Sequence, residues 1–270
     1  TLVFDQNLSS VRANLLSVNL TGYSVDKDGN MTGLPLLYKV EDETVARIKV
    51  TRQEDLLAHW KLDEELYTSA TDSEGAYHGT LVNLPNTGPS NSWKPGLFSN
   101  ALDLGAPGGK VELGSVPVEG AFTLSMWLKS QDSNGSASTI LSKDELMAMN
   151  VFKFEKAASS GIASFRFFPD GNSTSLDLNS SSPVLVDNQW VHLVVSYDGN
   201  ATLTMYADAV QVAQSAGVSI SGMPLNQRYS NMKVGSSSNP YDGLIDDLRI
   251  YQAALSQTDV SDIYGQGGGD

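Results

Sequence analysis

The sequence predicts an all-β protein: a sandwich of two antiparallel sheets, with one short helix near the end of the chain. Turn-forming residue pairs recur at short intervals, and brief runs rich in Val, Ile, Leu, Thr and aromatic residues lie between them. Within one such run, Phe122, Leu124 and Met126 share one face of a strand, and Trp127 lies on the opposite face. This period of two is typical of a strand with one buried face.

Further strands follow from the same pattern. They are predicted at residues 45–50, 162–168, 190–197, 203–207, 232–235 and 244–251. A turn at residues 198–200 joins two of them as a hairpin. The single predicted helix begins after Ser256, which can cap it together with Asp259, and it ends at Gly265.

Composition excludes several classes of protein. The 270-residue chain carries 17 Lys and Arg against 31 Asp and Glu, a net charge of -14, so it has no basic surface for a nucleic-acid backbone. It contains no Cys, which excludes disulfides, thiolate zinc sites and a cysteine nucleophile. No apolar run approaches the roughly 18 residues of a membrane-spanning helix. We therefore expect neither a nucleic-acid partner nor a membrane span.

Three parts of the chain differ in composition. Residues 1–55 lack Trp and are expected to form a partial N-terminal β module, or strands docked on the main domain, with a turn at 26–30 and a hairpin at 36–50. Residues 56–265 form the sandwich, and residues 266–270 are a Gly-rich linker tail. Both ends of the sequence suggest a piece of a longer, multidomain protein.

From residue 56 onward, several motifs occur in a characteristic order. They are LLAHWKLDEE from Leu56, ATDSEGAYHGTLVN from Ala70, SWKPGLFSNALDL from Ser92, KVELG from Lys110, FTLSMWLKS from Phe122, WVHLVVSYDGNATLTMYADAVQV from Trp190 and MKVGSSSNPYDGLIDDLRIYQAALSQTDVSDIY from Met232. In this order the chain resembles the bacterial laminin-G-like branch of the concanavalin A-like lectin/glucanase superfamily, over about four fifths of its length. One departure is Asp208 and Ala209, where such domains often have Asp-Gly in a hairpin. The resemblance implies a jelly-roll with loops gathered along its rim.

The resemblance also implies a structural calcium ion where the first strand of the domain meets the closing strand. The matching positions are Asp63 and Asp246, and backbone carbonyls of the turn at His78 and Gly79 would complete the ligands. The alternative is that Asp63 ends a strand by turn chemistry and that Asp246 accepts hydrogen bonds from neighbouring amides. If calcium binds, it would take the stabilising place of the disulfides that this chain lacks.

Catalytic residues are not predicted. Glycanases of the families resembled carry two carboxylates on one face of a strand. Here the acidic neighbours 63–65 and 246–247 alternate between faces, so neither run supplies such a pair. We expect this chain not to be an enzyme, although its parent protein could carry a polysaccharide-degrading domain.

A glycan-binding surface would need an aromatic platform and polar side chains. Trp127 is a candidate platform on the concave face, with packing between elements as the alternative. Four residues in predicted loops could form a rim site: Tyr229, Asn231, Asn239 and Tyr241.

These observations predict a non-catalytic carbohydrate-binding or adhesive accessory module of a larger secreted or cell-surface protein, bacterial in type, with a structural calcium ion. A polysaccharide or glycan is the expected ligand, and other domains of the same chain are possible partners. Two alternatives remain open: a glycan-degrading hydrolase or lyase on the same fold, and a structural spacer or protein-binding module of a large adhesin.

Overall fold

The computed structural model describes residues 55–118, 120–144, 150–168, 176–215 and 231–267, together with two short strands near the N-terminus. The chain divides into two compact units, Thr1–Val50 and Thr51–Asp270. In the first unit, β1 (Ser24–Val25) pairs with β2 (Met31–Thr32) in an antiparallel hairpin. The predicted hairpin at 36–50 and the turn at 26–30 lie outside the described residues.

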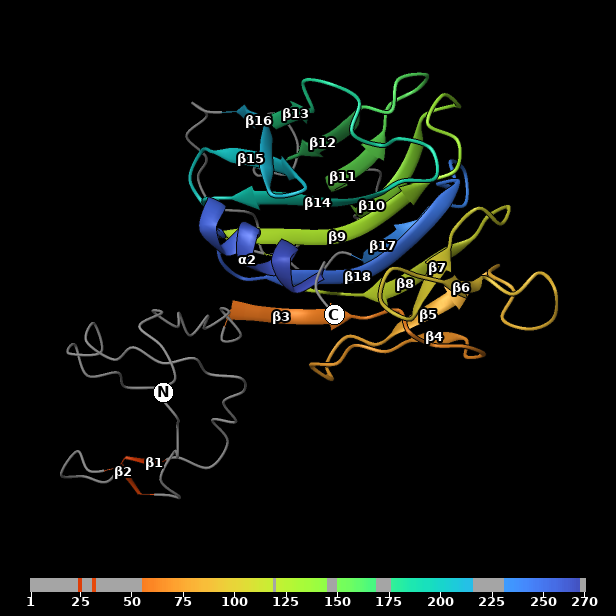
Figure 1. The fold of residues 1–270 in the computed structure, drawn as a ribbon, viewed down its shortest axis with the longest axis horizontal. Helices are drawn as coiled ribbons and strands as arrows, with labels where there is room; N and C mark the ends of the chain where they lie inside the picture. Colours follow the sequence, from red (N-terminus) through yellow and green to blue (C-terminus); the bar gives the residue numbers. More distant parts are fainter. Residues whose placement is uncertain are drawn as a thin grey trace, which may run out of the picture. The chain divides into compact units, whose positions relative to one another are not determined.

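The second unit contains two antiparallel sheets, as predicted (Figure 1). The first, here named the β10 sheet, has the order β13 (Leu176–Asn179), β12 (Ala163–Phe167), β11 (Asn150–Lys156), β10 (Ser138–Asp144), β17 (Asn231–Gly235), β8 (Lys110–Gly114), β5 (Gly79–Val82) and β4 (Ser69–Ala70). The second, here named the β9 sheet, has the order β16 (Val210–Ser215), β15 (Leu203–Ala207), β14 (Trp190–Tyr197), β9 (Phe122–Ser130), β18 (Gly243–Tyr251), β7 (Asn100–Asp103) and β6 (Trp93–Pro95), and β3 (Leu56–Trp60) also pairs with β18. Strands distant in sequence are thus neighbours in space.

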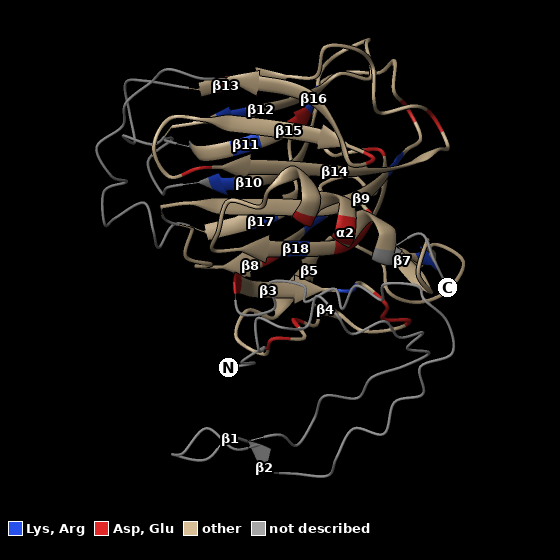
Figure 2. Cartoon of the chain, turned by 60° about the vertical axis from the view of Figure 1, so that its left-hand side comes forward, with Lys and Arg blue, Asp and Glu red and all other residues tan. Residues whose placement is uncertain are grey.

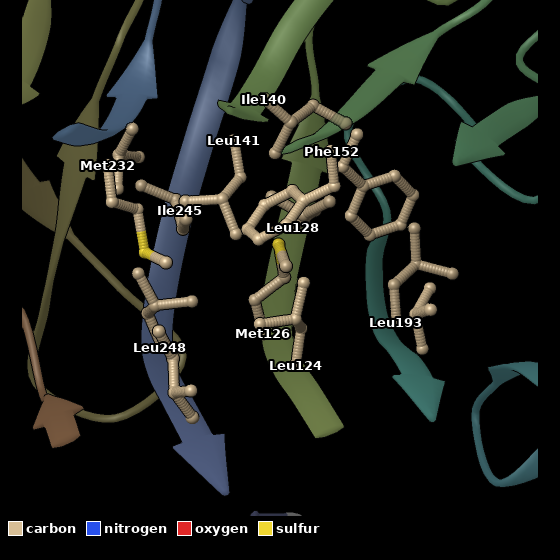
Figure 3. Packing of buried hydrophobic residues seen from close by; sticks show 14 of the residues in the cluster. Leu124, Met126, Leu128, Ile140, Leu141, Phe152, Leu193, Met232, Ile245 and Leu248 are labelled. Atoms are coloured by element: carbon tan, nitrogen blue, oxygen red, sulfur yellow. The ribbon is translucent and has the colours of Figure 1, made fainter. Parts of the chain in front are cut away.

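The core lies between the two sheets. Leu124, Met126 and Leu128 of β9 are fully buried there, opposite Ile140 and Phe152 of the β10 sheet (Figure 3). The predicted alternation along β9 is therefore confirmed for its apolar face. Side chains from both sheets form one buried cluster, so their packing holds the two sheets face to face and excludes water.

The outer face of the β9 sheet is covered by α2 (Gln257–Gly267). A second apolar cluster fixes the helix there; it consists of Val194, Tyr206, Tyr251, Leu255, Val260 and Ile263. The capping prediction is confirmed: the Ser256 hydroxyl accepts a hydrogen bond from the Asp259 N–H (3.3 Å), and the Asp259 carboxylate accepts one from the Ser256 N–H (2.8 Å). The helix runs two residues beyond the predicted end at Gly265. No helix in the described part of the chain combines the length and apolar character needed to cross a membrane.

The β15–β16 hairpin turns at Asp208 and Ala209. Both adopt left-handed backbone conformations, with φ of 49° and 60°. The turn therefore forms without the Gly that such a conformation favours, and Ala209 carries a steric penalty.

Candidate functional site

Asp246 lies on β18, directly opposite Trp127 of β9, and is fully buried. Its Oδ2 accepts hydrogen bonds from the backbone N–H groups of Leu97 (2.8 Å) and Phe98 (3.2 Å), in the loop that joins β6 to β7. Its Oδ1 is buried and has no hydrogen-bond partner. A buried carboxylate oxygen without a partner is costly, so this atom marks a place where another group is expected.

Asn100, at the start of β7, connects Asp63 to the same loop. Its N–H donates to Asp63 Oδ1 (3.3 Å), and its side-chain amide donates to the carbonyl of Asp63 (3.1 Å). A Cβ on Gly96 would lie 2.4 Å from the Asn100 carbonyl oxygen and 2.7 Å from Asp246 Oδ2, so both oxygens lie against the Gly96 Cα. The structure therefore brings the two predicted carboxylates, Asp63 and Asp246, to one short loop.

The charge at this place is not balanced. Burial raises the pKa of Asp246 to about 7; the N–H groups of Leu97 and Phe98 oppose this rise, and the negative charges of Asp247 and Asp63 add to it. Burial also raises the pKa of Asp63, although the hydrogen bond from the Asn100 N–H and the positive charge of Lys61 oppose the rise. The site thus holds two carboxylates that repel each other, which a cation would relieve. Among the residues that the structure describes, no group of three or more His, Asp or Glu side chains converges as a metal site, so a cation here would depend on backbone carbonyls as well.

Asp247, by contrast, is fully satisfied. Its Oδ1 lies 2.6 Å from His59 Nε2, and its Oδ2 lies 2.9 Å from an Arg249 nitrogen. Burial alone would raise the pKa of Asp247, but the His59 hydrogen bond and the Arg249 charge outweigh burial and lower it. The register of β18 against β9 shifts between Asp246 and Arg249, and Asp247 has a left-handed backbone conformation with a φ of 50°.

His78 and Gly79, the other two predicted calcium ligands, contact residues other than Asp63 and Asp246. His78 Nδ1 accepts a hydrogen bond from the N–H of Asp72 (3.1 Å). A Cβ on Gly79 would lie 2.6 Å from Val111 and 2.8 Å from Leu113, so Gly79 packs against β8. The carbonyl that lies beside Asp246 belongs to Asn100. Sequence analysis did not identify Asn100 as part of this site. The available signal was its position directly after the loop that begins at Gly96, within the motif SWKPGLFSNALDL.

Trp127 does point away from the core, as predicted, but it is almost fully buried. Its ring stacks on Tyr264 of α2 at 5.5 Å and lies 5.0 Å from the His192 ring, and Phe98 meets it edge-on at 5.8 Å. The outer face is covered at this point, so the ring is not open to a ligand here. The alternative interpretation, packing between elements, describes this environment.

The predicted rim residues do not form one surface. Asn231 is exposed at the start of β17, and Asn239 is exposed beyond the other end of that strand. Tyr241 is fully buried in the core, and Tyr229 lies outside the described residues. Their closeness in sequence was misleading because a whole strand separates Asn231 from Asn239.

One close pair was not foreseen. Ser125 Oγ lies 2.8 Å from His192 Nε2, an arrangement seen in nucleophilic catalysis. Both residues are 1% exposed beneath α2, and burial lowers the pKa of His192 to about 4. A substrate could not reach the Ser125 hydroxyl in this conformation, so the pair is a packing contact between β9 and β14.

The fold and this site define a lectin-like β-sandwich with a paired-carboxylate site at the junction of its first and closing strands. Residues 104–261, more than half of the chain, match the concanavalin A-like lectin/glucanases superfamily. The chain belongs to this family. No curated protein sequence matches the chain.

Solved structures with the same fold include domain 4 of AbnA, a GH43 extracellular arabinanase from Geobacillus stearothermophilus, in complex with arabinotriose. It is 20% identical, with a TM-score of 0.59 over 78% of this chain and 98% of that domain. The binding domain of Paraclostridial mosquitocidal protein 1 is 14% identical, with a TM-score of 0.62 over 79% of this chain. The ligand-binding domain of botulinum neurotoxin serotype D, in complex with N-acetylneuraminic acid, is 16% identical, with a TM-score of 0.61 over 79% of this chain. The chain spans 52% and 51% of these two toxin domains.

Proposed function

We propose that this chain is a non-catalytic carbohydrate-binding or adhesive accessory module of a larger secreted or cell-surface bacterial protein, stabilised by calcium. The observation that carries the proposal is the match over nearly the whole of domain 4 of an extracellular arabinanase, a structure that contains arabinotriose. By analogy with that domain, this chain could bind a polysaccharide as one module of a larger protein.

The non-catalytic part of the proposal is supported by how the acidic residues are used. Asp247 is neutralised by His59 and Arg249, and Asp246 holds the backbone of the 96–99 loop. The Ser125 and His192 pair is sealed beneath α2. A glycosidase needs two carboxylates that flank a sugar, and both Asp246 and Asp247 are buried where a sugar cannot reach them.

The donor atoms between β3 and β18 support the calcium part of the proposal. Asp246 Oδ1, the Asp63 carboxylate and the Asn100 carbonyl are all hard oxygen ligands, which Ca²⁺ prefers. When bound, calcium would offset the repulsion between the two carboxylates, which the charge of Lys61 relieves only for Asp63. The residues themselves already tie the end of β3, the 96–99 loop and β18 together, so the ion's role would be structural.

The proposal is tested by screening the intact chain against neutral and anionic oligosaccharides, with calcium and again with EDTA. We expect binding to at least one class of glycan in calcium. If no glycan binds over a broad panel while calcium still raises the melting temperature, the chain is instead a structural spacer of an adhesin.

A further inference from the structure

The loop between β3 and β4 is held by side chains from elsewhere in the chain. Five successive carbonyls, from Asp63 to Tyr67, each accept a side-chain N–H. The donors are Asn100 Nδ2 to Asp63 (3.1 Å) and to Glu64 (3.4 Å), Asn91 Nδ2 to Glu65 (2.8 Å), Asn86 Nδ2 to Leu66 (2.9 Å) and Trp93 Nε1 to Tyr67 (2.9 Å). The backbone carbonyls of this loop thus have hydrogen-bond partners although the loop pairs with no strand.

The fixed loop presents apolar side chains to water. Tyr67 is 67% exposed and Leu66 is 59% exposed. Tyr67 is the one aromatic residue among the exposed large hydrophobic side chains that the structure describes. Since the hydrogen bonds hold only the backbone, they do not account for the exposed ring. An exposed aromatic ring on a backbone that is held in place is typical of a binding surface.

We infer that Tyr67 is the platform on which a neutral sugar ring stacks, with Glu65 beside it as an acceptor for sugar hydroxyls. This inference rests on the proposed carbohydrate-binding function and gives it a location. Because the loop backbone that carries the ring is already held, little backbone entropy is lost on binding, so a single aromatic contact can be effective.

The charge around Tyr67 selects the class of sugar. Asp63, Glu64 and Glu65 lie two to four positions before it, and Figure 2 shows acidic residues on the loops beside β3 and β4. The whole chain carries a net charge of -14. Sialic acids and uronates would be repelled, whereas an uncharged sugar can place its apolar face on the ring and its hydroxyls on the carboxylate.

The experiment compares the wild-type chain with Tyr67→Ala and Tyr67→Phe. The neutral probes are arabinotriose, xylotriose and cellotriose, the anionic probes are N-acetylneuraminic acid and trigalacturonate, and binding is followed by calorimetry. We expect Tyr67→Ala to weaken binding of the neutral probe about tenfold or more, and Tyr67→Phe to retain most of it. Val210→Ala is the matched control, because Val210 is 64% exposed at the β15–β16 turn; its affinity should equal that of the wild type.

A second variant tests the positioning of the loop with Tyr67 left intact. Asn91 donates to the Glu65 carbonyl and accepts a hydrogen bond from the Trp93 N–H (3.1 Å). Asn91→Asp keeps the acceptor and removes the donor. We expect weaker sugar binding, with a circular dichroism spectrum like that of the wild type showing that the fold is retained.

The outcomes separate the two proposals. A wild-type chain that binds none of the probes would contradict the proposed function and this inference with it. If the wild type binds a neutral probe and Tyr67→Ala binds it equally tightly, carbohydrate binding stands and the role of Tyr67 is overturned. Preference for the anionic probes would overturn the selection by charge.

Discussion

Replacing Asp246 by Asn separates the two tasks of this carboxylate. Oδ2 accepts hydrogen bonds from the N–H groups of Leu97 and Phe98, and the amide oxygen of Asn can accept both. The amide nitrogen of Asn would then occupy the position of Oδ1, the buried oxygen that has no partner. Asp246→Asn should therefore keep the 96–99 loop in place and remove the oxygen that is free for a cation.

The size of the effect follows from mass action. A ligand present at about 100 times its dissociation constant stabilises the folded state by about 2.7 kcal/mol. For a domain of this size, each kcal/mol corresponds to a change in melting temperature of about 2–4 °C. Calcium should thus raise the melting temperature of the wild type by about 5–10 °C, and that of Asp246→Asn by close to nothing. In EDTA the variant should be at least as stable as the wild type, because it removes a buried negative charge that lies near Asp63 and Asp247.

The assay is thermal unfolding followed by circular dichroism, in excess calcium and in excess EDTA. Asp63→Ala should also abolish the calcium shift. Asp177→Asn is the matched control: it removes the same charge from an exposed pair with Arg166 and should keep the full shift. A calcium shift that survives in Asp246→Asn, or a wild type that melts at the same temperature in both buffers, would refute the cation site.

Three further predictions concern stability. Ala209 has a φ of 60°, so Ala209→Gly should raise the free energy of unfolding by about 1 kcal/mol in urea titration, and no gain would contradict the strain. Burial lowers the pKa of Lys143 from 10.5 to about 8, so unfolding takes up a proton between these values and stability should rise with pH there; Lys143→Met should flatten that rise, and an equal slope in both proteins would count against it. Burial lowers the pKa of His192 from 6.5 to about 4, with Asp247 opposing and Arg249 assisting this shift. The free energy of unfolding should therefore fall by up to about 3 kcal/mol as the pH falls from 6.5 to 4. His192→Gln should lose this dependence, and the same loss of stability in the variant would contradict the assignment to His192.

The fold could be predicted from sequence because its signals are local. The alternation along residues 122–130 identifies the apolar face of β9 without knowledge of its partners, and Ser256 with Asp259 identifies the start of α2. The order of the motifs then places the strands in the correct family. Each of these signals depends on residues only a few positions apart.

The surroundings of single side chains could not be predicted in the same way. Trp127 lies on the expected face, but a residue more than a hundred positions later, Tyr264, covers it. Tyr241 was expected in a rim loop, and the return of the chain into β18 buries it. The same holds for the loop at residues 63–67, whose donors come from three other segments. Such contacts depend on how loops distant in sequence pack together, and the alternation of apolar and polar residues along a strand does not predict this.

Asn100 connects the cation site to the Tyr67 loop, and this link predicts that the two ligands assist each other. Its N–H contacts the Asp63 carboxylate, and its side chain holds the carbonyls of Asp63 and Glu64, where that loop begins. An ion held by Asp63 would restrict the loop before sugar binds, so calcium should tighten sugar binding, and sugar must then tighten calcium binding by the same factor. Asn100→Ala keeps both carboxylates and the backbone carbonyl but removes the side-chain link, so each ligand should still bind without affecting the other. Calorimetry of arabinotriose with calcium and with EDTA, and of calcium with and without the sugar, measures both factors. A factor of one in the wild type would show that the two ligands are not coupled, and an undiminished factor in Asn100→Ala would show that the coupling does not pass through Asn100.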